Sequence, residues 1–270
     1  MLPPTAIWEG RYSSLFTDVF VHAGAQSGIP WHLLFNLLYL VLLGRILEET
    51  IHPALWMLFF VASGVALSGA ELAFSGHNAI GVSGVIYAMF GLMWAGRYEN
   101  RTWAQIATPK TFRILIAWGI LCVIISYFGI LNIANYSHAA GLLFGLAVGW
   151  LFVAKRRTPL AVLILASLWI VMLLAITWLP WSPAWLLWRG DVALRNRDFA
   201  TALRSYNRSL ERGENSRVLK DRIRTAAALV QDRTAAQRAI DAYTQAAIDQ
   251  QEEAARRMKL PWPFNLRKDQ

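Results

Sequence analysis

Cysteine and charge are both scarce over much of this 270-residue sequence. Cys122 is the only cysteine, so no disulfide can form within the chain and cysteine usage indicates no redox compartment. Asp, Glu, Lys and Arg are absent from 114–154 and again from 158–188. Hydrophobic residues make up 56% of the chain and the mean hydropathy is +0.37, which is too apolar for an ordinary soluble domain of this size.

Six apolar segments are long enough to cross a bilayer, whose core needs about 20 apolar residues per helix. We expect the spans at roughly 31–47, 54–72, 79–97, 113–131, 136–154 and 160–179. Their interiors are expected to hold no Asp, Glu, Lys or Arg, which argues against a transporter or a channel. The predicted fold class is all-α: a polytopic helical membrane bundle of about six spans, followed by a small C-terminal helical soluble domain.

Positively charged residues set the expected orientation of the spans. Lys and Arg follow the first, third and fifth spans and are absent from the connections 73–78 and 132–135. The ends of the first, third and fifth spans are therefore expected in the cytoplasm. The N-terminus and the tail after the sixth span are expected outside. The net charge of +9 is explained by this topology signal and by a solvated tail, so no nucleic-acid partner is predicted. An interfacial aromatic belt is expected at the end of the last span, formed by Trp178, Trp181, Trp185 and Trp188.

Residues 81–84 read Gly-Val-Ser-Gly inside an apolar span. A serine hydroxyl becomes a strong nucleophile only when a base removes its proton. Gly81 and Gly84 leave room beside Ser83 for close approach of a backbone, a helix or a substrate. Near a helix start, the unpaired backbone N–H groups of the first turn can face a developing oxyanion. The alternative is a small-residue helix contact, which is common in membranes.

A histidine in a second span is a candidate base for this serine. Gly141, Gly145 and Gly149 recur every fourth residue, so one face of their span is nearly bare and another helix can pack closely against it. His138 lies about one turn before Gly141 and at a depth similar to that of Ser83, where it can act as a general base. The alternative is a histidine bonded to a carbonyl group or to water.

His32 and Asn36 are four residues apart and therefore share one face of the first span. Both lie near its expected outer end, so their side-chain donors can bind the same oxygen atom. The alternative is an interfacial histidine together with an asparagine that joins helices. A purely structural bundle would not explain why the polar residues of three spans share one depth.

Taken together, these residues resemble the rhomboid family of intramembrane serine proteases over about residues 8–154. The matching motifs are H-x-x-x-N (His32, Asn36), G-x-S-G followed by Tyr (Gly81, Ser83, Gly84, Tyr87) and H-x-x-G-x-x-x-G (His138, Gly141, Gly145). Members of this family cleave transmembrane helices of other proteins near the outer side of the membrane. The resemblance implies no metal and no cofactor, transmembrane protein substrates in a lipid bilayer, and a bacterial inner membrane as the default location.

The resemblance also implies a role for each matching residue. Ser83 is expected to be the nucleophile and His138 its base, without an acidic third member. His32, Asn36 and the Ser83 amide are expected to form the oxyanion hole, and Tyr87 to pack against the imidazole ring. The alternative function is a non-catalytic rhomboid-like membrane protein that holds client transmembrane helices; relatives of that kind usually lose the serine or the histidine.

This sequence departs from the family pattern at both ends. Residues 1–30 contain no apolar run long enough for the span that usually precedes the first loop. The resemblance implies that they form an outer loop segment and that His22 corresponds to a structural histidine of the family. The expected division of the chain is 1–30 for this loop, 31–154 for the catalytic membrane core, 155–182 for an additional span, 183–256 for a helical domain and 257–270 for a flexible tail.

The helical domain resembles a tetratricopeptide repeat. Gly190, Asp198-Phe199, Ala202 and Tyr206 occur at the expected offsets, whereas a second repeat is only weakly indicated. The alternative is a plain helical hairpin. If the tail lies outside, on the same side as Ser83, residues 189–256 are expected to bind a protein partner or to select substrates.

Overall fold

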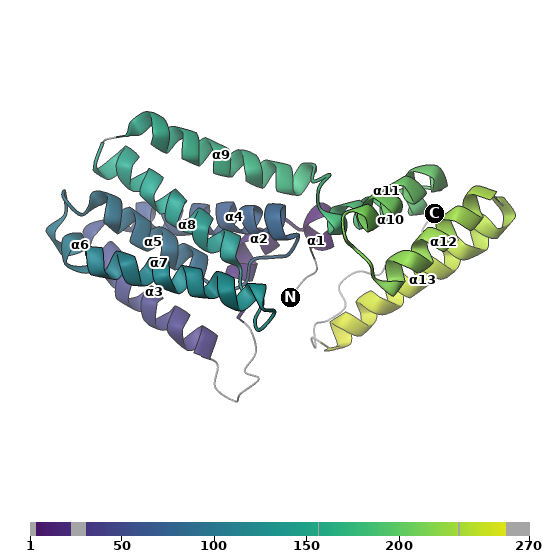
Figure 1. The fold of residues 1–270 in the computed structure, drawn as a ribbon, viewed down its shortest axis with the longest axis horizontal. Helices are drawn as coiled ribbons and strands as arrows, with labels where there is room; N and C mark the ends of the chain where they lie inside the picture. The colour runs from purple at the N-terminus through teal and green to yellow at the C-terminus, as the bar shows by residue number, and fades with distance from the viewer. Residues whose placement is uncertain (1–3, 23–30, 156, 232, 258–270) are drawn as a thin grey trace. The chain divides into compact units, whose positions relative to one another are not determined.

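The computed structural model describes residues 4–22, 31–155, 157–231 and 233–257, and this part of the chain is helical and contains no strand. The chain divides into two compact units, Met1–Ser182 and Pro183–Gln270. The first unit carries the apolar segments, and the second consists of polar helices. Figure 1 shows the elements of both units.

The first unit begins with the short helices α1 (Thr5–Trp8) and α2 (Ser14–Thr17) and the 3₁₀ turn η1 (Asp18–Phe20). Each expected span then corresponds to one helix, and the short helix α6 (Arg101–Ile106) connects two of them. The spanning helices are α3 (Trp31–Thr50), α4 (Pro53–Ser75), α5 (Ser83–Gly96), α7 (Pro109–Tyr127), α8 (Asn135–Val148) with the π-helical turn η2 (Gly149–Val153), and α9 (Thr158–Thr177).

Four of these helices are long and apolar enough to cross a membrane by themselves, namely α4, α7, α8 with η2, and α9. Helix α3 carries Arg45, Glu48 and Glu49 near its end, and α5 has only 14 residues. Most residues of α5 are buried by the surrounding helices, so this helix has little contact with lipid.

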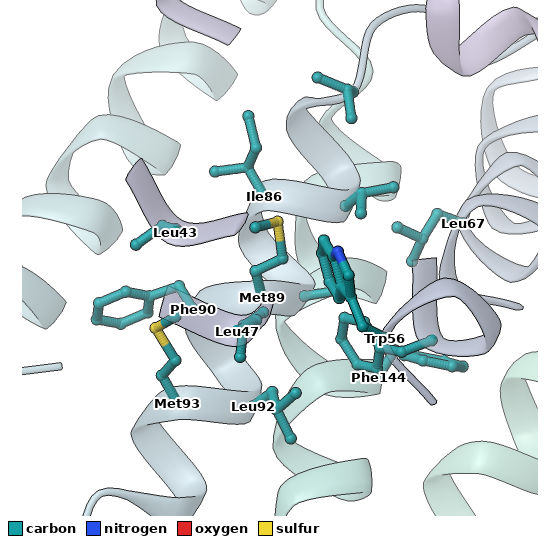
Figure 2. Packing of buried hydrophobic residues seen from close by; sticks show 14 of the residues in the cluster. Leu43, Leu47, Trp56, Leu67, Ile86, Met89, Phe90, Leu92, Met93 and Phe144 are labelled. Carbon is teal, nitrogen blue, oxygen red and sulfur yellow. The ribbon is translucent and has the colours of Figure 1, made fainter. Parts of the chain in front are cut away.

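The core of the first unit is built around α5. Figure 2 shows side chains from α3, α4 and α8 meeting those of α5 in one apolar cluster. Met89 and Met93 of α5 are completely buried in this cluster, which also includes Trp56 of α4 and Phe144 of α8. In contrast, Cys122 is the one buried residue of α7, whose exposed apolar side chains suit contact with lipid.

Glycines bring α5 and α8 into close contact. A Cβ atom at Gly141 would overlap the carbonyl oxygen of Gly84, and one at Gly145 would overlap that of Ala88. On the other side of the contact, a Cβ at Gly91 would come within 2.6 Å of the Leu142 carbonyl oxygen. The bare face expected from the glycine spacing of α8 therefore packs against α5, and the two backbones approach more closely than helices with larger residues can.

The expectation that no charged residue lies inside a span is wrong at Glu71. Helix α4 continues to Ser75, beyond the expected end at residue 72, and the Glu71 side chain within it is only 4% exposed. The carboxylate is tolerated because it accepts a hydrogen bond from the Ser137 backbone N–H at 2.9 Å.

The second unit contains α10 (Pro183–Arg195), α11 (Phe199–Glu211), α12 (Arg217–Gln231) and α13 (Arg233–Arg257). Helices α10 and α11 pack side by side, and a Cβ at Gly190 would overlap the ring of Tyr206. The Tyr206 hydroxyl donates to Asp191 at 2.8 Å, and Arg222 of α12 pairs with the same carboxylate at 3.2 Å. This partly buried ion pair joins the hairpin to the next helix.

The expected aromatic belt needs a correction. Trp178 and Trp181 follow α9, but Trp185 and Trp188 belong to α10 of the second unit. Trp185 is buried there rather than exposed at a membrane surface. Trp178 and Trp181 lie in the non-helical segment 178–182 between the two helices, where Pro180 is typical of a helix end.

Candidate active site

Ser83 and His138 lie at the first turns of the two helices that the glycines hold together. Helix α5 begins at Ser83, and His138 is the fourth residue of α8. The Ser83 Oγ lies 2.8 Å from His138 Nε2, within hydrogen-bond distance. His138 is 7% exposed, and its Nδ1 atom is buried without a hydrogen-bond partner in the described part of the chain. The arrangement is a pair of side chains without an acidic third member.

The Tyr87 ring packs against one face of the His138 imidazole. It lies one turn after Ser83 on α5, and its ring stacks on His138 with a centroid distance of 4.6 Å and an interplanar angle of 12°. The tyrosine hydroxyl donates a long hydrogen bond of 3.4 Å to the Leu115 carbonyl of α7. Because Nδ1 has no partner, this stacking contact is a main restraint on the plane of the imidazole.

His32 and Asn36 of α3 face the backbone just before Ser83. Gly81 has a φ of +85°, a conformation that side chains other than glycine rarely adopt. A Cβ at this position would come within 2.9 Å of His32 Nε2 and 3.2 Å of Asn36 Nδ2. Glycine therefore permits both the turn and the close approach of the two α3 side chains.

The side-chain amide of Asn36 lies near Gly81 and has a hydrogen-bond donor without a partner among the residues that the structure describes. The residue is 5% exposed, and its Nδ2 atom is buried without a hydrogen-bond partner in the described residues. The helix α5 begins without a side-chain cap, and the first backbone N–H groups of any helix lack partners within it. The α3 side chains thus lie against Gly81, two residues before Ser83 and the start of α5.

The segment before α3 anchors the loop that leads to Ser83. The Gly81 N–H donates to the Asp18 carbonyl at 3.4 Å, and Asn78 Nδ2 donates to the Asp18 carboxylate at 2.7 Å. Burial raises the pKa of the Asp18 carboxyl, and the hydrogen bond from Asn78 opposes this rise. His22 from the same segment lies with its ring 5.2 Å from that of His32.

The contributions of Asp18, Asn78 and Glu71 were not expected from the sequence. Asp18 and Asn78 are separated by 60 residues and lie in loop segments without a recognisable pattern, so no sequence signal links them. Glu71 did have a signal, because it is a lone acidic residue in an apolar segment, but the segment end was expected one residue later.

A cavity of about 200 Å³ lies at the other end of α5. Its lining includes Trp94 and Arg97 of that end together with Trp150 and Arg157. Since Ser83 is at the opposite end of α5, this cavity is not part of the Ser83–His138 site.

The rhomboid domain matches residues 9–155, which include all the residues of this site. The chain is also similar to proteins called rhomboid protease GlpG. It is 35% identical to the one of Yersinia pestis (strain Pestoides F) over 121 residues, covering 44% of this chain and 42% of that protein. It is 31% identical to the one of Pectobacterium atrosepticum over 130 residues, covering 47% and 46%. The chain therefore aligns with less than half the length of these relatives.

The helical bundle and the comparisons both indicate a membrane protein. The apolar helices support a multi-pass integral membrane protein, and the bacterial relatives support a bacterial inner membrane as its location. The domain match extends over more than half of the chain and includes both the glycine-packed helices and the segment before α3. This chain belongs to the rhomboid family.

Proposed function

We propose that this protein is an intramembrane serine endopeptidase that cleaves transmembrane segments of other membrane proteins by a Ser83–His138 dyad. The observation that carries the proposal is the 2.8 Å contact between Ser83 Oγ and His138 Nε2. A serine hydroxyl within hydrogen-bond reach of a neutral imidazole is the arrangement that nucleophilic catalysis requires. The rhomboid proteases to which the chain is similar support the same reaction class.

The reaction follows from this geometry. His138 Nε2 takes the hydroxyl proton as Ser83 Oγ bonds to the carbonyl carbon of the substrate peptide. The peptide C–N bond then breaks, and the imidazole returns the proton to the leaving amine. Water attacks the resulting ester in the same way and releases Ser83. Each step uses groups of the protein, the substrate and water, so no metal or cofactor is needed.

Stabilisation of the oxyanion is assigned to His32, Asn36 and the Ser83 amide. The buried Asn36 Nδ2 atom supports this role, because a buried donor without a partner is costly unless a ligand or a transition state uses it. The left-handed turn at Gly81 leaves this donor close to the backbone that precedes the nucleophile.

Cleavage near the outer leaflet is supported by the charges at the other ends of the helices. Arg97 follows the end of α5, and Lys155 and Arg157 follow η2. By the positive-inside rule these ends face the cytoplasm, so the first turns that carry Ser83 and His138 face the outer side.

For the second unit we propose a tetratricopeptide-like domain over 183–256 that binds a protein partner or selects substrates. Packing of Gly190 against Tyr206 in the α10–α11 hairpin supports this proposal. The remaining division is proposed as 1–30 for the outer loop, 31–154 for the catalytic core and 155–182 for the additional span. The proposed tail is 257–270, of which 258–270 lie outside the described residues.

The proteolytic activity can be tested with the full chain reconstituted in vesicles together with a set of tagged single-span membrane proteins. We expect cleavage of at least one of them near its outer end and no cleavage by Ser83→Ala. Mass spectrometry of the fragments gives the position of the cut. Cleavage by Ser83→Ala at the wild-type rate would refute the mechanism, and intact substrates with folded wild-type protein would favour the non-catalytic binding function.

A further inference from the structure

A buried acidic residue outside the dyad contacts the helix that carries the base. Glu71 of α4 is 4% exposed and accepts a hydrogen bond from the Ser137 N–H at 2.9 Å. The Ser75 hydroxyl, one turn later on α4, donates to the Glu71 backbone carbonyl at 2.8 Å. Burying a carboxylate in a membrane protein is costly, so the hydrogen bond from the Ser137 N–H indicates that Glu71 has a specific role.

The carboxylate supplies a cap that α8 lacks in its own sequence. The cap residue of α8 is Ala134, which offers no side-chain hydrogen bond. Tyr136 and Ser137 are the second and third residues of the helix, and their N–H groups are among those that need an outside partner. A negative charge at this end also interacts favourably with the helix dipole. Glu71 therefore caps α8 from a neighbouring helix.

The capped turn is the one that holds the catalytic geometry. His138 is the next residue after Ser137, and a Cβ at Gly84 would overlap the Ser137 hydroxyl. Ser137 thus lies between the Glu71 carboxylate and the residue that follows the nucleophile. The described part of the chain has no side chain that accepts from His138 Nδ1, Glu71 included, so the imidazole depends on its backbone and on Tyr87 for its position.

We propose that Glu71 is a positioning residue: its carboxylate fixes the first turn of α8 so that His138 Nε2 stays within reach of Ser83. This inference rests on the proposed function of these two residues. Glu71 acts through the backbone of α8 and does not touch the substrate or the reacting atoms. In a catalytic triad, an acidic side chain bonds to the imidazole and orients it. Here Glu71 instead holds the α8 backbone that carries His138.

The test compares Glu71→Leu and Glu71→Gln with wild type in the full chain. Glu49→Leu is the matched control, because Glu49 is exposed and pairs with Arg45 at 3.0 Å away from the site. Inactivation by a fluorophosphonate probe gives a maximal rate and a probe affinity separately. Hydrogen exchange at residues 136–138 reports the cap directly, without requiring activity.

Glu71→Leu is expected to lower the maximal inactivation rate by about 10- to 100-fold, because small displacements of a catalytic group are costly. The probe affinity is expected to stay within about twofold, and exchange at residues 136–138 to rise by about tenfold or more. Glu71→Gln retains an acceptor oxygen, so it is expected to restore most of the rate and of the protection. Glu49→Leu is expected to behave like wild type.

Two results would overturn the inference while leaving the proposed function intact. One is that the probe labels the wild type and that Glu71→Leu has the same maximal inactivation rate and the same exchange at residues 136–138. The other is an equal loss of rate and folded fraction in Glu71→Leu and Glu71→Gln, which would assign the residue to general stability. A folded wild type that the probe does not label would refute the proposed function itself and the inference with it; the exchange contrast would then show whether the cap exists.

Discussion

At the scale of single residues, the proposed site combines a nucleophile, Ser83, a base, His138, and a buried donor, Asn36 Nδ2, that has no hydrogen-bond partner in the described residues. Asn36 is the most informative of the donors, because its Nδ2 atom is buried without a partner beside the Gly81 backbone. A group that only joined helices would be expected to use its donor within the protein. The side chain is instead available to the reaction.

Asn36→Ala is therefore expected to fold normally and to lose about 100- to 1000-fold in rate, as for other oxyanion donors. The rate of inactivation by a fluorophosphonate probe measures this loss. Asn100→Ala serves as the control, since Asn100 caps α6 away from the site. Inactivation of Asn36→Ala at the wild-type rate would remove Asn36 from the oxyanion hole.

Tyr87 gives a second prediction at this scale. The contact with His138 is between ring faces, and the Tyr87 hydroxyl makes only a long hydrogen bond. Tyr87→Phe keeps the ring and is expected to stay within about twofold of wild type, whereas Tyr87→Ala is expected to lose about 10- to 100-fold by freeing the imidazole. A Phe variant as slow as the Ala variant would show that the hydroxyl matters instead of the ring.

At the scale of elements, the close contact between α5 and α8 brings the two active-site turns together. A methyl group at Gly145 would overlap the Ala88 carbonyl oxygen, so the helices would have to separate. Gly145→Ala is expected to cost about 1–3 kcal/mol in stability and to lower the melting temperature. Gly44→Ala is the control, because its methyl group would lie no closer than 3.8 Å to a neighbour. Equal melting temperatures for the two variants would contradict the packing account.

The first turn of α11 is expected to respond to pH. The Asp198 side chain accepts a hydrogen bond from the Thr201 N–H at 3.0 Å, and hydrogen bonds from Thr201 lower the pKa of the Asp198 carboxyl. A lowered pKa means that the folded helix prefers the ionised form. The stabilisation is thus present above the ordinary pKa of Asp, about 3.9, and is lost as the pH falls through the lower folded value.

The protection factor for hydrogen exchange at the start of α11, which corrects for the intrinsic pH dependence of exchange, is expected to fall on acidification. Asp198→Asn, a neutral cap, is expected to remove this part of the pH dependence. The same pH response in wild type and Asp198→Asn would show that another group is responsible.

At the scale of the whole molecule, the residues of the site all come from the first unit, Met1–Ser182. Removing residues 189–270 is therefore expected to leave probe labelling of Ser83 within about twofold of wild type, a small effect in free energy. The same deletion is expected to change which membrane proteins are cleaved. Loss of labelling would show that the second unit is needed for the reactivity of Ser83. An unchanged choice of substrates would reject its proposed role in substrate selection.

The sequence predicted the fold class well because long apolar segments and glycine spacing are local signals. The residues of the rhomboid motifs are also brought together as expected, with Ser83 at a helix start and His138 opposite it. Glu71 and Asp18 were missed because their partners are backbone groups and loop side chains far along the chain. A contact to a backbone N–H does not depend on which side chain the partner residue has, so the sequence does not reveal it.

The most direct test of the account is labelling of the detergent-purified full chain with a fluorophosphonate probe, beside Ser83→Ala and His138→Ala. The probe reacts with a serine only when a base activates its hydroxyl. We predict labelling of the wild type at Ser83 and none of either variant. An intact, folded wild-type protein that remains unlabelled, or labelling that survives in His138→Ala, would contradict the proposed dyad.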